Sequence, residues 1–151
     1  MRAGVLALLL APAAGAPGPA TAGGGCMQLV VRQFPAAVEL ARCRLPPGGR
    51  FMLSFIHSVS QTPVTDAYRV EEGRIIQESE TFMTHEAGLP SQVGEPGGLA
   101  WEHRDRRFIL HLELPIPQLV MRTDRRYCNR LHLPDHVVDL NQWPDQALEL
   151  R

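Results

Sequence analysis

Residues 51–64 read FMLSFIHSVSQTPV, an alternating apolar run that leads directly into a polar cluster. Within the run, Phe51, Leu53 and Phe55 alternate with smaller or more polar neighbours, which places them on one face of an extended strand. The same two-residue period recurs along the chain, and no amphipathic stretch of helical length without proline or glycine stands out. The sequence therefore predicts an all-β fold, either a small sandwich or an open barrel of roughly eight short strands.

Other segments share this strand-like pattern. We expect strands at Met27 to Val31, Val38 to Leu45, Val64 to Glu71, Arg74 to Thr81, Arg107 to Leu114, Gln118 to Thr123, Leu131 to Leu133, Val137 to Leu140 and Ala147 to Leu150. Glycine predicts turns at 46–49 and 71–73, because it adopts positive φ without strain. Asn141 to Asp145 is a further expected turn. Residues 86–98 hold two prolines and four glycines, which predicts a loop, and Pro115 and Pro117 are expected to end the strand before them.

Size and charge fit one soluble domain. The chain has 151 residues, of which 44% are hydrophobic and 21% charged, with a formal net charge of -1. Interspersed charges of both signs give no basic surface for a polyanion, so we expect no nucleic-acid partner. We expect a single β-rich domain at residues 26–151, with no internal repeat.

The first residues resemble a secretory leader. Arg2 precedes an apolar run from Val5 to Leu10, and small residues and prolines follow through Ala22. We predict a signal peptide at residues 1–22, with cleavage after Ala14, Ala16 or Ala22, and therefore an exported protein. The apolar run is too short to span a bilayer. A lipid anchor at Cys26 is the less favoured alternative, because Gly23 stands where such signals usually carry leucine.

Three cysteines leave the thiol pairing open. One alternative joins Cys43 to Cys128 and lipidates Cys26, and another joins Cys26 to Cys43 and buries Cys128. In the third alternative, all three serve as small apolar residues. The sequence does not choose between these pairings, because spacing alone does not reveal disulfide connectivity.

A catalytic triad is the first chemistry to test. His57 and Ser58 are adjacent and Asp66 follows, but neighbouring residues on an extended strand point to opposite faces. We therefore expect no nucleophile and base at this position, because a triad is defined by its geometry. The alternative interpretation is that His57, Ser58 and Thr62 hold a turn together.

A metal site is the second possible kind of functional site. Two sets of side chains offer nitrogen and oxygen ligands suited to zinc: His132 and His136 with Asp135, and His85 and His103 with Glu86. Neither set has a recognised ligand spacing on a predicted helix, so we expect no metal and no cofactor.

Two motifs carry a family resemblance. The first is Phe55-Ile56-His57-Ser58-Val59, followed by Thr62-Pro63-Val64 and Asp66, and the second is Ala87-Gly88-Leu89-Pro90. Together they resemble the bacterial family called domain of unknown function 1850. The chain departs from the family pattern at Glu86, where glycine is expected, and at Asp66, where glutamate is commoner.

The resemblance implies an uncharacterised periplasmic protein, frequently encoded beside a tripartite ATP-independent periplasmic transporter of the TAXI type for carboxylate-like solutes. On this basis we expect a non-catalytic accessory domain that contacts the transporter, its solute-binding protein or a carried carboxylate. The expected contact face comprises His57, Ser58, Thr62, Pro63, Asp66, Tyr68, Gly88, Leu89 and Pro90. The alternative is a small hydrolase or zinc-dependent enzyme that acts on the transported solute, with His57 as base or the later histidines as ligands.

Overall fold

A computed structural model describes residues 27–83, 94 and 96–151, which form strands joined by short turns. The strands are β1 (Gln28–Phe34), β2 (Glu39–Arg44), β3 (Phe51–Ile56), β4 (Pro63–Glu71), β5 (Arg74–Phe82), β6 (Gly98–Arg104), β7 (Arg107–Ile116), β8 (Leu119–Arg122), β9 (Arg130–His132), β10 (Val137–Asp139) and β11 (Ala147–Leu150). Two single-turn 3₁₀ helices, η1 (Arg125–Tyr127) and η2 (Leu140–Gln142), connect the later strands. Among these residues, no helix is long and apolar enough to cross a membrane.

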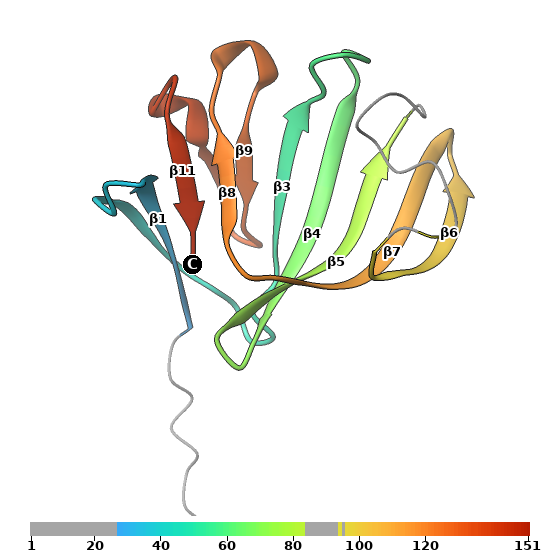
Figure 1. Cartoon of the computed structure of the whole chain (residues 1–151), viewed down its shortest axis with the longest axis horizontal. Helices are drawn as coiled ribbons and strands as arrows, with labels where there is room; N and C mark the ends of the chain where they lie inside the picture. The colour runs from blue at the N-terminus through green and yellow to red at the C-terminus, as the bar shows by residue number, and fades with distance from the viewer. Residues whose placement is uncertain (1–26, 84–93, 95) are drawn as a thin grey trace, which may run out of the picture.

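The strands form two antiparallel sheets. The smaller sheet has the order β2-β1-β11-β8, and the larger has the order β10-β9-β3-β4-β5-β7-β6. In Figure 1 the larger sheet spreads as a fan from β9 to β6, and β1 and β11 of the smaller sheet lie at the opposite side from β6. Both sheets keep two edge strands, so neither closes on itself. Of the two predicted architectures, the structure has the sandwich.

The all-β prediction is confirmed, and each strand-like segment named from the sequence forms a strand. The described residues contain eleven strands where roughly eight were expected, and β6 was not predicted at all. Pro115 does not end β7, which continues to Ile116. The first residue of β6, Gly98, lies opposite Leu112, so β6 does not extend alongside Pro115. The N–H that proline lacks is therefore not needed to pair β7 with β6 at this position.

The β4–β5 hairpin shows why the sequence predicts its turn correctly. Glu72 and Gly73 form a two-residue connection, and both have positive φ, at +50° and +76°. Two successive left-handed residues match the twist of a tight hairpin, and glycine adopts this conformation at little cost. Nothing lies within 4 Å of the place where a side chain at Gly73 would begin, so its backbone conformation alone accounts for the glycine.

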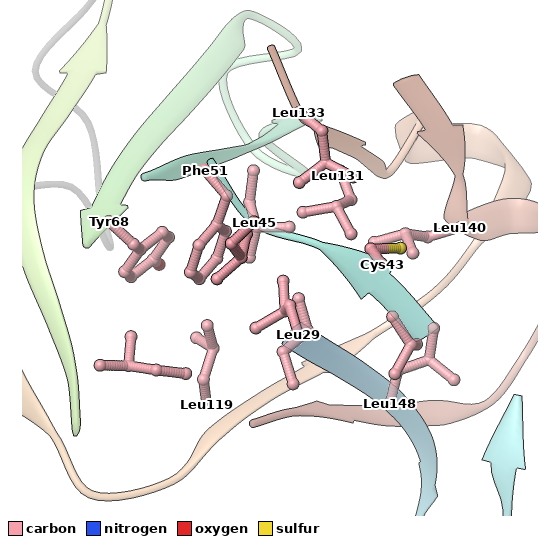
Figure 2. Close-up of a cluster of buried hydrophobic side chains, with 14 residues drawn as sticks. Leu29, Cys43, Leu45, Phe51, Tyr68, Leu119, Leu131, Leu133, Leu140 and Leu148 are labelled. Carbon is pink, nitrogen blue, oxygen red and sulfur yellow. The ribbon is translucent and has the colours of Figure 1, made fainter. Parts of the chain in front are cut away.

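The main core lies between the two sheets. It is built mostly of leucines that come from nearly every strand of the smaller sheet and from the adjoining strands of the larger one (Figure 2). Leu29, Leu131, Leu140 and Leu148 are completely buried. Phe51 and Tyr68 stack beside them with ring centroids 5.1 Å apart. Burial of this apolar surface is the main favourable contribution to folding.

Replacing Leu148 by alanine tests this core. The substitution leaves a cavity between the sheets, and we expect it to lower the free energy of unfolding by about 2–5 kcal/mol. Leu99→Ala is the matched control, because Leu99 is 68% exposed on β6 and its loss should change stability by less than about 0.5 kcal/mol. Urea unfolding followed by circular dichroism measures both variants, and equal effects would contradict this assignment of the core.

Candidate functional site

The β3–β4 turn is held by a compact set of hydrogen bonds. The His57 N–H donates to the Thr62 carbonyl at 2.9 Å, and the Gln61 N–H donates to the His57 carbonyl at 2.9 Å. The Ser60 N–H lies 3.3 Å from His57 Nδ1, and the Ser60 hydroxyl lies 3.2 Å from the same atom and 2.8 Å from the Thr62 hydroxyl. A backbone donor at Nδ1 requires that nitrogen to be an acceptor, which assigns the proton of the neutral imidazole to Nε2.

This geometry corrects the sequence interpretation of His57 and Ser58. The strand ends at Ile56, so the two residues do not alternate across a strand but lie in the turn itself. Within the described residues, the hydrogen bonds of His57 go to Ser60, Gln61 and Thr62, and none joins it to Ser58. The interpretation that polar side chains hold a turn together is confirmed for His57 and Thr62, with Ser60 in place of Ser58.

Asp66 and Tyr68 lie farther along β4, where Tyr68 is buried and Asp66 is half-buried. Alternation places both on the same face of β4 as Val64, the face that packs toward the smaller sheet. Tyr68 is 4% exposed, and its hydroxyl donates to Asp66 Oδ2 at 3.2 Å. The second oxygen, Oδ1, is buried without a hydrogen-bond partner. Glu80 of β5 is the residue opposite Asp66 in the ladder, so two acidic side chains are neighbours on this face.

Burial controls the charge of this pair. It raises the pKa of Asp66 to about 6, although the hydrogen bond from Tyr68 acts in the opposite direction. Burial, together with the nearby charge of Asp66, also raises the pKa of Tyr68 well above its ordinary value. A carboxyl group with a buried, unsatisfied oxygen is more stable protonated, because the neutral form costs less to remove from water.

A second hydrophobic cluster adjoins the turn. Val64 and Phe82 are fully buried, and Phe55, Trp101 and Phe108 pack around them. The ring of Phe82 meets Trp101 edge-on and Phe108 nearly face-on, each with centroids 5.9 Å apart. Asp66 therefore lies between two apolar regions, since Val64 belongs to this cluster and Tyr68 to the main core.

The structure brings together only some of the predicted site residues. His57 and Thr62 meet in the turn that Pro63 closes, whereas Asp66 and Tyr68 form a separate pair inside the sheet. Gly88, Leu89 and Pro90, with the neighbouring Glu86, lie outside the described residues, as do the predicted leader and Cys26. Whether the nine residues share one contact face stays a prediction.

Each described histidine named as a metal ligand has another side chain as its neighbour, and His85 lies outside the described residues. His132 Nε2 is 2.7 Å from the Ser54 hydroxyl, and His136 Nδ1 is 2.8 Å from Asp135. His103 stacks on Phe108, with ring centroids 4.7 Å apart. In residues 27–83, 94 and 96–151, no three metal-ligating side chains converge.

Sequence reasoning missed the pairing of Ser54 with His132. The two residues are 78 positions apart and meet because β3 pairs with β9, where Ser54 lies opposite Arg130. A hydroxyl within hydrogen-bond reach of an imidazole is the first requirement of a nucleophile and base. The pair lacks a carboxylate bonded to Nδ1 among the described contacts, and β3 has neighbours on both sides that occupy its N–H groups.

Two of the three cysteines can be placed. Cys43 is buried and Cys128 is exposed, and both are free thiols. The Cys43 to Cys128 disulfide is therefore absent from the structure, and the alternative that buries Cys128 is wrong. Cys128 follows η1 in the left-handed conformation, with φ of +49°. Burial raises the pKa of the Cys43 thiol and makes it less reactive.

The fold and the turn define a small two-sheet β domain with a polar, hydrogen-bonded β3–β4 connection. The family model described as "Domain of unknown function (DUF1850)" matches residues 51–140, from the start of β3 into η2. This chain belongs to that family, as the resemblance indicated. No curated protein and no solved structure matches the chain.

The buried carboxyl group of Asp66 predicts a pH dependence of stability. An unfolded aspartate titrates near pH 4, so between about pH 4 and 6 the folded chain retains a proton that the unfolded chain has lost. The stabilisation from this proton is complete below about pH 4 and is lost as the pH rises through 6. We expect wild type to lose about 2 kcal/mol more than Asp66→Asn between pH 4 and 7.

Urea unfolding at several pH values measures this difference. Asp105→Asn is the matched control, because it makes the same exchange at an exposed turn, and its profile should follow wild type. Parallel profiles for wild type and Asp66→Asn would show that Asp66 does not hold a proton in the folded chain.

Proposed function

We propose that this chain is an exported, periplasmic, non-catalytic accessory domain associated with a TAXI-type tripartite ATP-independent periplasmic transporter for carboxylate-like solutes. The partner is a transporter component or the solute-binding protein, and the contact is made through the β3–β4 turn. The family membership supports an uncharacterised domain, and the leader-like start supports export. The transporter and the periplasm rest on the resemblance described above.

The main support for a contact surface at the β3–β4 turn is the exposure of Val59. This apolar side chain is 59% exposed in a turn whose other residues are fixed by hydrogen bonds. An exposed apolar group on a preorganised loop loses little conformational entropy when a partner covers it, so it serves well as an anchor. Ser58 and Pro63 lie in and beside the same turn and extend the surface.

The buried residues have a supporting role in this proposal. Tyr68 is buried and Asp66 is only partly exposed, so we confine the contact to the turn and assign these two a place beneath it. Removing the His57 imidazole would free the turn, because its Nδ1 atom accepts from Ser60 and orders the chain around Val59.

A pull-down with transporter components tests this function. We expect Val59→Asp and His57→Ala to reduce recovery of the components at least tenfold relative to wild type, since one charges the anchor and the other releases the turn. Val38→Asp is the matched control, because Val38 is similarly exposed, at 53%, in the β1–β2 connection, and it should leave recovery unchanged. Equal recovery by all variants, or none by wild type, would contradict the proposal.

The second candidate function is hydrolysis, favoured by the 2.7 Å contact between Ser54 and His132. Because the pair lacks an orienting carboxylate and free backbone donors, we expect a fluorophosphonate probe to leave Ser54 unmodified. Intact-mass analysis measures this directly, with Ser54→Ala and His132→Ala as references. Labelling that both substitutions abolish would favour the hydrolase over the accessory domain.

A further inference from the structure

A cavity of about 660 Å³ opens at the other end of β4, away from the β3–β4 turn. It lies between the β4–β5 hairpin, the β7–β8 connection and the ends of β1 and β11. In Figure 1 the chain that leaves β7 crosses below the larger sheet to reach β8. Residues 115–119 of this connection line the cavity. The volume is within the range of about 300–1,000 Å³ that small-molecule sites usually have.

Apolar side chains from both sheets form the floor of the cavity: Met27, Val70, Ile75, Ile116, Leu119 and Leu150. All six belong to the main core or pack against it, so the cavity is an opening of that core toward solvent. The part of this floor that is open to water comes from Met27, Val70 and Ile116, which are partly exposed, and covering it with a ligand is favourable. The floor therefore fits an aliphatic or otherwise apolar group.

The charged side chains that line the cavity differ in how strongly other protein groups already bind them. Glu149 is the one carboxylate side chain among the lining residues, and it already accepts from Arg32 at 2.6 Å and from Gln118 at 3.2 Å. Arg74 is 67% exposed and pairs with Glu72, which is 79% exposed, in a surface ion pair of the kind that contributes little to stability. Arg151 adds a second guanidinium to the lining.

We propose that this cavity binds an apolar molecule that ends in an anionic head group, with the tail on the apolar floor and the head beside Arg74. The acidic side chain that would oppose such a ligand is neutralised by Arg32, whereas the Arg74 guanidinium is free to exchange a weak partner for the ligand. A guanidinium matches a carboxylate in both charge and hydrogen-bond geometry. The site is separate from the β3–β4 turn and does not depend on the proposed transporter contact.

Decanoate is the probe that tests the site, followed by amide chemical-shift changes in the ¹⁵N-labelled full chain and by calorimetry. We expect saturable binding, with shifts at the amides of Gly73, Ile75, Ile116 and Leu119. Decanol, which has the same tail without the charge, should bind at least fivefold more weakly, and decylamine should not bind, because Arg74 would repel it.

Two variants locate the ligand. Arg74→Gln should weaken decanoate binding about fivefold to tenfold by removing the partner of the head group, and Ile116→Trp should abolish binding by filling the floor. Arg107→Gln removes the same charge at the far end of β7 and should bind as wild type does. Thermal melting of each variant confirms that it is folded.

Other results would overturn the proposal. Shifts outside the cavity, equal affinity for decanoate and decylamine, or the same loss in Arg107→Gln as in Arg74→Gln would show non-specific binding. Because the pull-down and this titration probe different ends of the domain, failure of one leaves the result of the other intact.

Discussion

Packing of leucine side chains between the two sheets is the interaction on which the rest of the structure depends. The smaller sheet contributes fully buried residues such as Leu29 and Leu148, and the larger sheet contributes Leu131 to the same core. Because four strands cover less area than seven, part of the inner face of the larger sheet needs another source of burial. The aromatic cluster around Phe82 supplies it at the end nearest the β3–β4 turn.

This division of the inner face explains the position of Asp66. Its neighbours on the same face of β4 belong to different clusters, Val64 to the aromatic one and Tyr68 to the main core. At the boundary a polar residue can be accommodated, but its carboxyl group has lost most of its water and gained a single hydrogen bond in return. The raised pKa is the direct consequence of that exchange.

Much of the fold could be predicted because strand alternation is a local property. Residues 51–56 and 107–116 show it plainly, and both form strands. β6 could not be predicted from the sequence, because it begins with glycine, ends in polar residues and pairs on one side only. An edge strand of this kind has little buried surface and therefore little apolar alternation. In β5, Glu78 is an extra residue, because Ser79 lies opposite Ala67 of β4 while Gln77 lies opposite Tyr68. This bulge interrupts the strict alternation of side chains along β5.

The candidate sites also differ in whether their residues are close together in the sequence. His57 and Thr62 could be predicted because they are near in sequence and close a single turn. The contact between Ser54 and His132, and the cavity beside Arg74, could not, because each is assembled from segments that only strand pairing and sheet packing bring together.

The two ends of β4 are physically separate. Nine extended residues at a rise of about 3.3 Å each place the β3–β4 turn and the β4–β5 hairpin roughly 25 Å apart. Substitutions that far apart without shared partners act independently on stability and binding. Asp66 lies between them in a fully paired strand, so its protonation alters the stability of the sheet that joins both ends without changing the groups exposed at either one.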